Sequence, residues 1–274
     1  MGKGPRPPFP PVDPACAGRK RCCPPSSYSG SLPPVERVIL AGADGAPAFS
    51  YVEDERYGLP CADLVEVMGP GAVDAIMAKL PGWAVAGPVD LGEALVARGA
   101  RVMRHAHEMT GELRTAPPAE AGAPEGFRFV PCDRSPEEVF AAWRAAYPAG
   151  HPDHRNVDDA AALRDLLTPL LAGKVTGEIL PCSVLAVDRD DVVAGGVVVT
   201  LFHGRPWVVE VFRHPARTPP GLGARMLAAV RDRAAADGWE RLGLVVSESN
   251  PARRVYERLG FTLVGSSMTV VIPS

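Results

Sequence analysis

Two stretches near the end of the chain decide the fold: EVFRHPARTPPGLGARML (Glu210–Leu227) and SNPARRVYERLGF (Ser249–Phe261). The first is predicted to run from a strand through a Gly/Pro loop into a helix. Such a junction directs free backbone N–H groups and the positive end of the helix at one point, which suits a pyrophosphate. Taken alone this signal is weak, because the Gly-Leu-Gly turn at 221–223 is equally compatible with a tight strand-to-helix connection. The second stretch predicts a helix that begins at Pro251 and stops at Gly260.

Taken together, the two stretches resemble the GNAT superfamily of acetyl-CoA-dependent N-acetyltransferases. That family carries a strand ending near ELYVHPEYRGRGIG, then a helix, and later N…A..LYERLGF. Here EVFRHPARTPPGLG aligns with the first motif without gaps, and NPARRVYERLGF follows in the same order. The resemblance covers about residues 127–272. It implies the mixed α/β (α+β) sheet of the GNAT fold and acetyl-CoA as co-substrate.

The resemblance also implies which backbone groups hold the cofactor. The strand before His-Pro would pair with the pantetheine arm of CoA through Val211, Phe212 and Arg213. Amides of the loop and of the helix start would hold the pyrophosphate, namely those of Gly221, Leu222, Gly223 and Ala224. Asn250 is the remaining candidate for cofactor contact.

Two departures from the family pattern weaken the anion-binding loop. Thr218 stands where the family usually has arginine, with Arg217 one place early. Pro219 and Pro220 follow, and each removes a backbone donor. In addition, Asn250 lies six residues before the tyrosine of the second motif, where seven is the commoner spacing, so its cofactor contact is in doubt.

The catalytic residues implied by the resemblance are a tyrosine and a carboxylate. Tyr256 is the family's proton donor to the departing CoA thiolate; its alternative role is a half-buried aromatic that packs the last helix. Glu210 heads the candidates for general base, directly or through water, because the amine must lose a proton to attack the thioester. A surface or salt-bridged glutamate is an equal alternative. Glu248 is a second candidate base.

Composition bounds the function further. The chain has 274 residues and a formal net charge of −3 from 29 basic and 32 acidic residues, so it lacks the charge of a dedicated nucleic-acid binder. No run of about 18 apolar residues predicts a membrane span, and no apolar run near the N-terminus predicts a signal peptide. We therefore expect a cytosolic protein without membrane or nucleic-acid partners. The six scattered cysteines form no CxxC pair, so neither a zinc site nor a disulfide framework is expected.

The expected domains are a disordered Pro-rich tail (1–34), an N-terminal α/β region (35–115), a Pro/Gly/Ala-rich linker (116–126) and the GNAT domain (127–274). The N-terminal region faintly repeats the GNAT motifs. Aligning Gly99 with Gly260 puts Leu95 opposite Tyr256 and Val89 opposite Asn250. This favours a degenerate GNAT-like half with apolar residues at the catalytic positions, although chance similarity of two α/β patterns is the alternative.

Four histidines carry a weaker signal. His151 and His154 lie where the family's first helices wall the acceptor site, and either bind substrate or belong to a solvated loop. His105 and His107 share one strand face, but no acid or cysteine nearby is expected to complete a metal site, so no metal is predicted.

The predicted function is therefore transfer of an acetyl group from acetyl-CoA to a primary amine of a small molecule or peptide, by direct attack. The alternative, from another class, is a catalytically silent acyl-CoA-binding or assembly module. The two prolines in the anion-binding loop favour this alternative.

Overall fold

The computed structural model describes residues 36–56, 58–117, 119–202 and 204–274, so the predicted tail at 1–34 lies outside the described residues. The chain divides into two compact units. One comprises the chain up to Arg104 together with Ser267–Ser274, and the other comprises His105–Ser266. Within the described ranges, no helix is long and apolar enough to cross a membrane. The mixed α/β class expected from the sequence is confirmed.

The second unit is built on one mixed sheet. Its strands, in spatial order, are the first part of β11 (Phe261–Val271), the second part of β5 (Arg101–Glu112), β10 (Arg241–Ser247), β9 (Arg205–Arg213), β8 (Val193–Phe202), β7 (Val184–Val187) and β6 (Arg128–Pro131). β10 and β9 run parallel, whereas β5 and β10, and all pairs from β9 to β6, are antiparallel.

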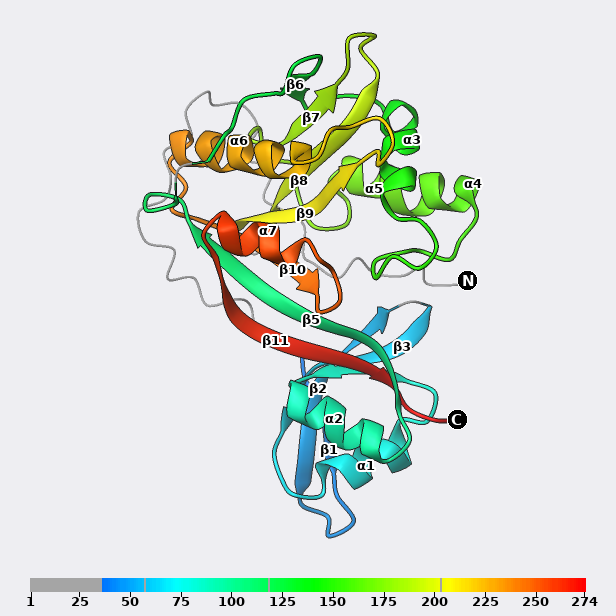
Figure 1. Ribbon diagram of the computed structural model, residues 1–274. Coiled ribbons are helices and arrows are strands. Elements are labelled where there is room, and N and C mark those ends of the chain that lie inside the picture. Colours follow the sequence, from blue (N-terminus) through cyan, green and yellow to red (C-terminus); the bar gives the residue numbers. More distant parts are fainter. Residues whose placement is uncertain (1–35, 57, 118, 203) are drawn as a thin grey trace, which may run out of the picture. The chain divides into compact units, whose positions relative to one another are not determined.

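Helices cover both faces of this sheet (Figure 1). Helix α6 (Leu222–Ala236) packs on the face that carries Val184 and Ala186, and α3 (Pro136–Ala146) packs on the face that carries Leu185 and Val187. Because side chains alternate along a strand, β7 is buried on both sides. The short helix α7 (Arg253–Arg258) joins β10 to β11.

Local sequence explains where the helices of the second unit begin and break. Ser135 and Glu138 form a capping box at the start of α3, next to Pro136. Residues 159–171 form three consecutive helical segments: α4 (Asp159–Ala161), a π-helical turn η2 (Ala162–Leu167) and α5 (Thr168–Leu171). Pro169 lacks the N–H needed to continue an α-helix there, and the widened turn precedes it.

The first unit repeats the same order of elements on a smaller scale. Its sheet contains β1 (Val38–Ala41), β2 (Pro47–Arg56), β3 (Leu59–Val67), β4 (Ala84–Gly87) and the second part of β11. α1 (Ala72–Lys79) connects the parallel strands β3 and β4, and α2 (Val89–Ala97) follows. Leu95 is fully buried in α2, and Gly99 ends that segment with a positive φ, as Gly260 does after α7.

Two long strands, β5 and β11, each continue from one unit into the other and complete the sheet there. Residues 106–112 of β5 pair with β10, and residues 268–271 of β11 pair with β4. The runs FTLVG and MTVVI near the C-terminus therefore lie in one continuous strand. For the same reason the compact units divide at 104/105 and 266/267, and the expected linker at 116–126 lies inside the second unit.

The parallel strands β9 and β10 stay together for only two residue pairs. Trp207 pairs with Gly243 and Val208 with Leu244, and a register shift against β8 leaves Val209 as a bulge. A Cβ on Gly243 would lie 2.3 Å from the ring of Trp207, so only glycine lets the indole cross this strand. Beyond the pair Val208–Leu244 the two strands diverge, because the bulge at Val209 bends and twists β9.

Replacing Gly243 therefore tests the crossing. Gly243→Ala is expected to lower the free energy of unfolding by about 1–3 kcal/mol, the usual range for overpacking. Gly265→Ala, also in a strand but with open space around its Cβ, serves as the matched control and should be near neutral. Chemical denaturation measures both. Equal stability of the two variants would mean that Trp207 does not require the glycine.

Candidate active site

The divergence of the strands leaves one edge of β9 open. His214 N–H, just after β9, donates to Ala194 of the β8 side at 2.8 Å. The N–H and C=O groups of successive residues point to opposite edges of a strand. The backbone groups of Phe212 therefore also face β8, whereas those of Val211 and Arg213 face the other edge. Among the described residues, no strand pairs with this second edge beyond Val208.

The loop after β9 ends at the start of α6. Gly221 has a φ of +87°, which glycine adopts without strain, and it precedes the first residue of the helix. Leu222 N–H donates to Pro219 at 3.4 Å, but in the described structure no backbone acceptor pairs with the amides of Gly221, Gly223 and Ala224. A Cβ on Gly223 would meet nothing within 4 Å, so space is open above this turn.

The two arginines next to the loop are both engaged by acids. Arg217 pairs with Asp188, and Arg225 pairs with Glu120. Thr218, at the usual arginine position, donates to the carbonyl of His214 at 2.8 Å. Its hydroxyl closes the loop locally and also accepts from Nη1 of Arg213 at 3.2 Å, so the guanidinium of Arg213 lies next to the loop.

A half-buried tyrosine and a half-buried glutamate meet beside the open edge of β9. The Tyr147 hydroxyl, just after α3, donates to Oε2 of Glu210 at 2.5 Å and lies 3.2 Å from the carbonyl oxygen of Val211. Burial raises the pKa of Glu210, while the hydrogen bond from Tyr147 and the nearby indole of Trp143 act in the opposite direction. The Trp143 Nε1 is itself buried and makes no well-aligned hydrogen bond. Glu210 is therefore a desolvated carboxylate with an elevated pKa.

Tyr256 is buried on α7 and packs against Phe261 with ring centroids 6.1 Å apart. Burial raises its pKa well above the ordinary value, and the charges of Asp153 and Glu210 add to the effect. The phenol therefore stays protonated over the whole physiological range.

Asp153 links the loop after α3 to the end of β10. Its carboxylate accepts from Ser247 Oγ at 2.8 Å and from Asn250 Nδ2 at 2.9 Å. The other side-chain atom of Asn250, Oδ1, accepts from the N–H of Ala252 at 2.9 Å. The side chain of Asn250 is thus engaged within the protein on both ends and orients the turn into α7.

The histidines of the same loop pack against Tyr147. The ring of His151 meets the tyrosine ring edge-on at 5.2 Å and accepts from the N–H of Asp153 at 3.0 Å. His154 Nδ1 lies 2.8 Å from the carbonyl oxygen of Tyr147. Both imidazoles hold the loop in place, a use that neither sequence-based alternative included.

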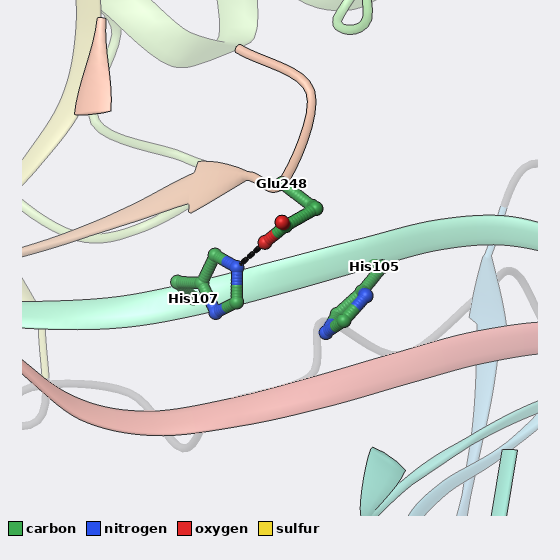
Figure 2. Close-up of side chains that lie close together, drawn as sticks. All are labelled: His105, His107 and Glu248. Atoms are coloured by element: carbon green, nitrogen blue, oxygen red, sulfur yellow. Dashed lines mark hydrogen bonds and ion pairs between the residues drawn. The ribbon is translucent and has the colours of Figure 1, made fainter. Parts of the chain in front are cut away.

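The histidine pair on β5 has an acidic neighbour after all. Figure 2 shows the Glu248 carboxylate, directly after β10, pointing at the ring of His107, with His105 close by. The expectation that no acid completes this pair was wrong, because the acid lies 141 residues away in sequence and is brought in by strand pairing. The hydrogen bond from His107 lowers the pKa of Glu248, with help from Arg253, which makes Glu248 a poor general base.

Sequence reasoning missed the roles of Tyr147, Trp143 and Ser247. Tyr147 lies one helical turn after Trp143, so both point from the same face of α3, and this apolar spacing indicated packing rather than chemistry. Only the fold brings that face against Glu210.

Comparisons with known proteins agree with this fold. Residues 137–261 match the family model described as the Acetyltransferase (GNAT) family. A GCN5-related N-acetyltransferase from Sphaerobacter thermophilus superposes with a TM-score of 0.58 at 17% identity, covering 90% of this chain and 84% of that chain. One from Kribbella flavida gives 0.55 at 19% identity, covering 87% and 90%.

A tandem GNAT protein from the clavulanic acid biosynthesis pathway superposes with a TM-score of 0.51 at 14% identity, covering 88% of this chain and 84% of that chain. The sequence has no match among curated proteins.

The fold and the diverging strands define an acyl-CoA N-acyltransferase architecture. Residues 137–261 form an acetyltransferase domain of the GNAT family, and the N-terminal half carries a second GNAT-like fold. The protein is thus a transferase, as the sequence predicted.

Proposed function

We propose that the protein transfers an acetyl group from acetyl-CoA to a primary amine, with Glu210 as general base and Tyr256 as general acid. The observation that carries this proposal is the hydrogen bond between the half-buried side chains of Tyr147 and Glu210 beside the open edge of β9, together with the buried phenol of Tyr256 on α7. A base with an elevated pKa and a phenol that stays protonated are the two proton-transfer groups that this reaction needs.

The cofactor is proposed to lie along β9 and over the start of α6. The outward-facing backbone groups of Val211 and Arg213 would pair with the pantetheine arm, while Phe212 contributes a buried side chain that anchors the strand. The unpaired amides of Gly221, Gly223 and Ala224 fit a pyrophosphate, because a helix start offers N–H donors and partial positive charge. The amide of Leu222 is partly used by Pro219.

The acceptor is proposed to approach from the side of Tyr147 and Asp153. A carboxylate at each of Glu210 and Asp153 favours a cationic amine of a small molecule or peptide. Glu210 accepts a proton from the amine, whose nitrogen then attacks the thioester carbonyl. The C–N bond forms, the C–S bond breaks, and Tyr256 protonates the departing sulfur. The nitrogen releases its second proton, which restores the Tyr256 phenol.

This mechanism needs no metal, and a cytosolic location stays a prediction from the sequence. Asn250 was expected to contact the cofactor. Its hydrogen bonds to Asp153 and Ala252 favour a positioning role for the turn that carries Tyr256.

The second candidate function is acyl-CoA binding without turnover. Pro219, Pro220 and the acid-paired Arg217 and Arg225 favour it, since they leave the pyrophosphate fewer donors. Acetyl-CoA turnover with a panel of amines separates the two candidates. Binding without turnover on any acceptor would support the silent module.

Tyr256→Phe tests the general acid. We expect kcat to fall by roughly tenfold to a thousandfold, with acetyl-CoA affinity nearly unchanged, because only the proton donor is removed. Steady-state kinetics and calorimetric titration measure the two quantities. Unchanged turnover would remove Tyr256 from the mechanism.

Tyr147→Phe tests the base through its pH dependence. Glu210 acts deprotonated, so kcat/KM should fall as the pH drops through its elevated pKa. Loss of the Tyr147 donor removes a hydrogen bond to the charged form, so the acidic limb should move to higher pH by on the order of one unit. In Glu210→Gln that limb should be absent. An acidic limb at the same pH in all three proteins would contradict the assignment.

Gly223→Val tests the cofactor position. The new side chain has room in the protein, so the variant should fold, but it fills the space above the unpaired amides and should abolish acetyl-CoA binding. The double change Pro219→Gly with Pro220→Arg should tighten binding by restoring donors. Calorimetric titration decides both. Binding of Gly223→Val at parental affinity would place the cofactor elsewhere.

A further inference from the structure

Three metal-ligand side chains converge in a cluster that the acyl transfer does not use. They are His105 and His107 on β5 and Glu248 directly after β10 (Figure 2). One ligand atom from each lies within 4.8 Å of those from the other two. That separation is short enough for a single ion to reach all three with small side-chain adjustments, since Zn–N and Zn–O bonds are about 2.0–2.2 Å long.

The backbone fixes this convergence. Positions two apart on a strand share one face, which brings the two imidazole centroids to 5.0 Å. The antiparallel register pairs Ala106 with Ser247, and the N–H of Glu248 donates to the carbonyl of His105 at 2.9 Å. All three ligands therefore stand on hydrogen-bonded strand backbone, which reduces the entropy lost on binding an ion.

His107 is also oriented as metal-bound histidines usually are. Its Nδ1 lies 2.8 Å from Ser266 Oγ, which leaves Nε2 directed at Glu248. Such a partner on the second ring nitrogen fixes the ring orientation and the tautomer of a ligand. The ring is nearly buried, with 7% of its side chain exposed, so it has little freedom to turn away.

The remaining contacts leave room for an ion. Glu248 is half-exposed and lines a depression of about 420 Å³, so solvent can reach the cluster. Arg253 contacts Glu248 at 3.3 Å and competes with a cation, but it also pairs with Glu257 at 3.0 Å and keeps that partner if Glu248 turns to a metal.

We propose that His105, His107 and Glu248 bind a divalent ion of the zinc class, with water completing the coordination. Two imidazoles and one carboxylate suit Zn²⁺, which accepts nitrogen and oxygen ligands in a four-coordinate site. The ion would tie β5 to the end of β10, one residue before the turn that leads to Asn250 and α7. Its role is to stabilise this unit, outside the acyl-transfer step.

Calorimetric titration of the untagged, chelator-treated full chain with Zn²⁺ tests the proposal. We expect one ion per chain, with affinity at least about tenfold weaker in His105→Ala and in Glu248→Gln. Zn²⁺ should raise the melting temperature of the parent and leave that of Glu248→Gln unchanged, because an ion stabilises only the state that binds it. Co²⁺ bound in the same place should show the absorption bands of a four-coordinate site.

Glu108→Gln is the matched control. Glu108 is exposed and follows His107 on β5, so its side chain lies on the opposite face of the strand from the two histidines. It should bind Zn²⁺ like the parent. His107→Ala is informative only if it folds, because the ring is buried. The tests with His105→Ala and Glu248→Gln do not depend on whether His107→Ala folds. The proposal is overturned if the parent does not bind Zn²⁺. It is also overturned if His105→Ala, Glu248→Gln and Glu108→Gln bind Zn²⁺ equally well, because the ion would then lie on other ligands of the chain.

Discussion

The early separation of β9 from β10 is the constraint on which the proposed site depends. The two parallel strands share only the pairs Trp207–Gly243 and Val208–Leu244, and the Val209 bulge turns β9 away. A strand edge that no other strand pairs is available to an extended ligand, which can add to it like a further strand. The separation leaves that edge open beside the start of α6, where further amides lack backbone partners.

Burial and hydrogen bonding act against each other on Glu210, and their balance sets its chemistry. Desolvation disfavours the charged carboxylate, while the short hydrogen bond from Tyr147 favours it, a contact of a kind worth about 1.5–3 kcal/mol. The raised pKa means that burial dominates. Burial and nearby negative charge both raise the pKa of Tyr256, so its phenol stays neutral. Glu210 is therefore suited to accept a proton and Tyr256 to donate one.

Sequence patterns predicted the C-terminal unit in much of its detail. The stretch 210–227 runs from β9 through a loop into α6, as its pattern predicted, and the two GNAT motifs led to the family and the fold. Strand β4 was not predicted, because four apolar residues between two helices carry too little periodicity. The exchange of β5 and β11 was equally invisible, since pairing between segments far apart in the chain leaves no local signal.

The site was predictable only where a motif marked it. Glu210 and Tyr256 lie inside motifs, and their positions followed from the resemblance. Tyr147 and Asp153 act through contacts made by folding, and a tyrosine at a helix end or an acid in a His-Pro-Asp-His loop is compatible with many roles. The meeting of Glu248 with His107 likewise depends on strand register, which no spacing in the sequence encodes.

Amide hydrogen exchange with and without acetyl-CoA tests the central claim most directly. If the open edge of β9 and the start of α6 form the cofactor site, the largest new protection should fall on the amides of Val211, Arg213, Gly223 and Ala224, with little change in the first unit. Protection that leaves these amides unchanged and appears elsewhere in the chain would contradict the account.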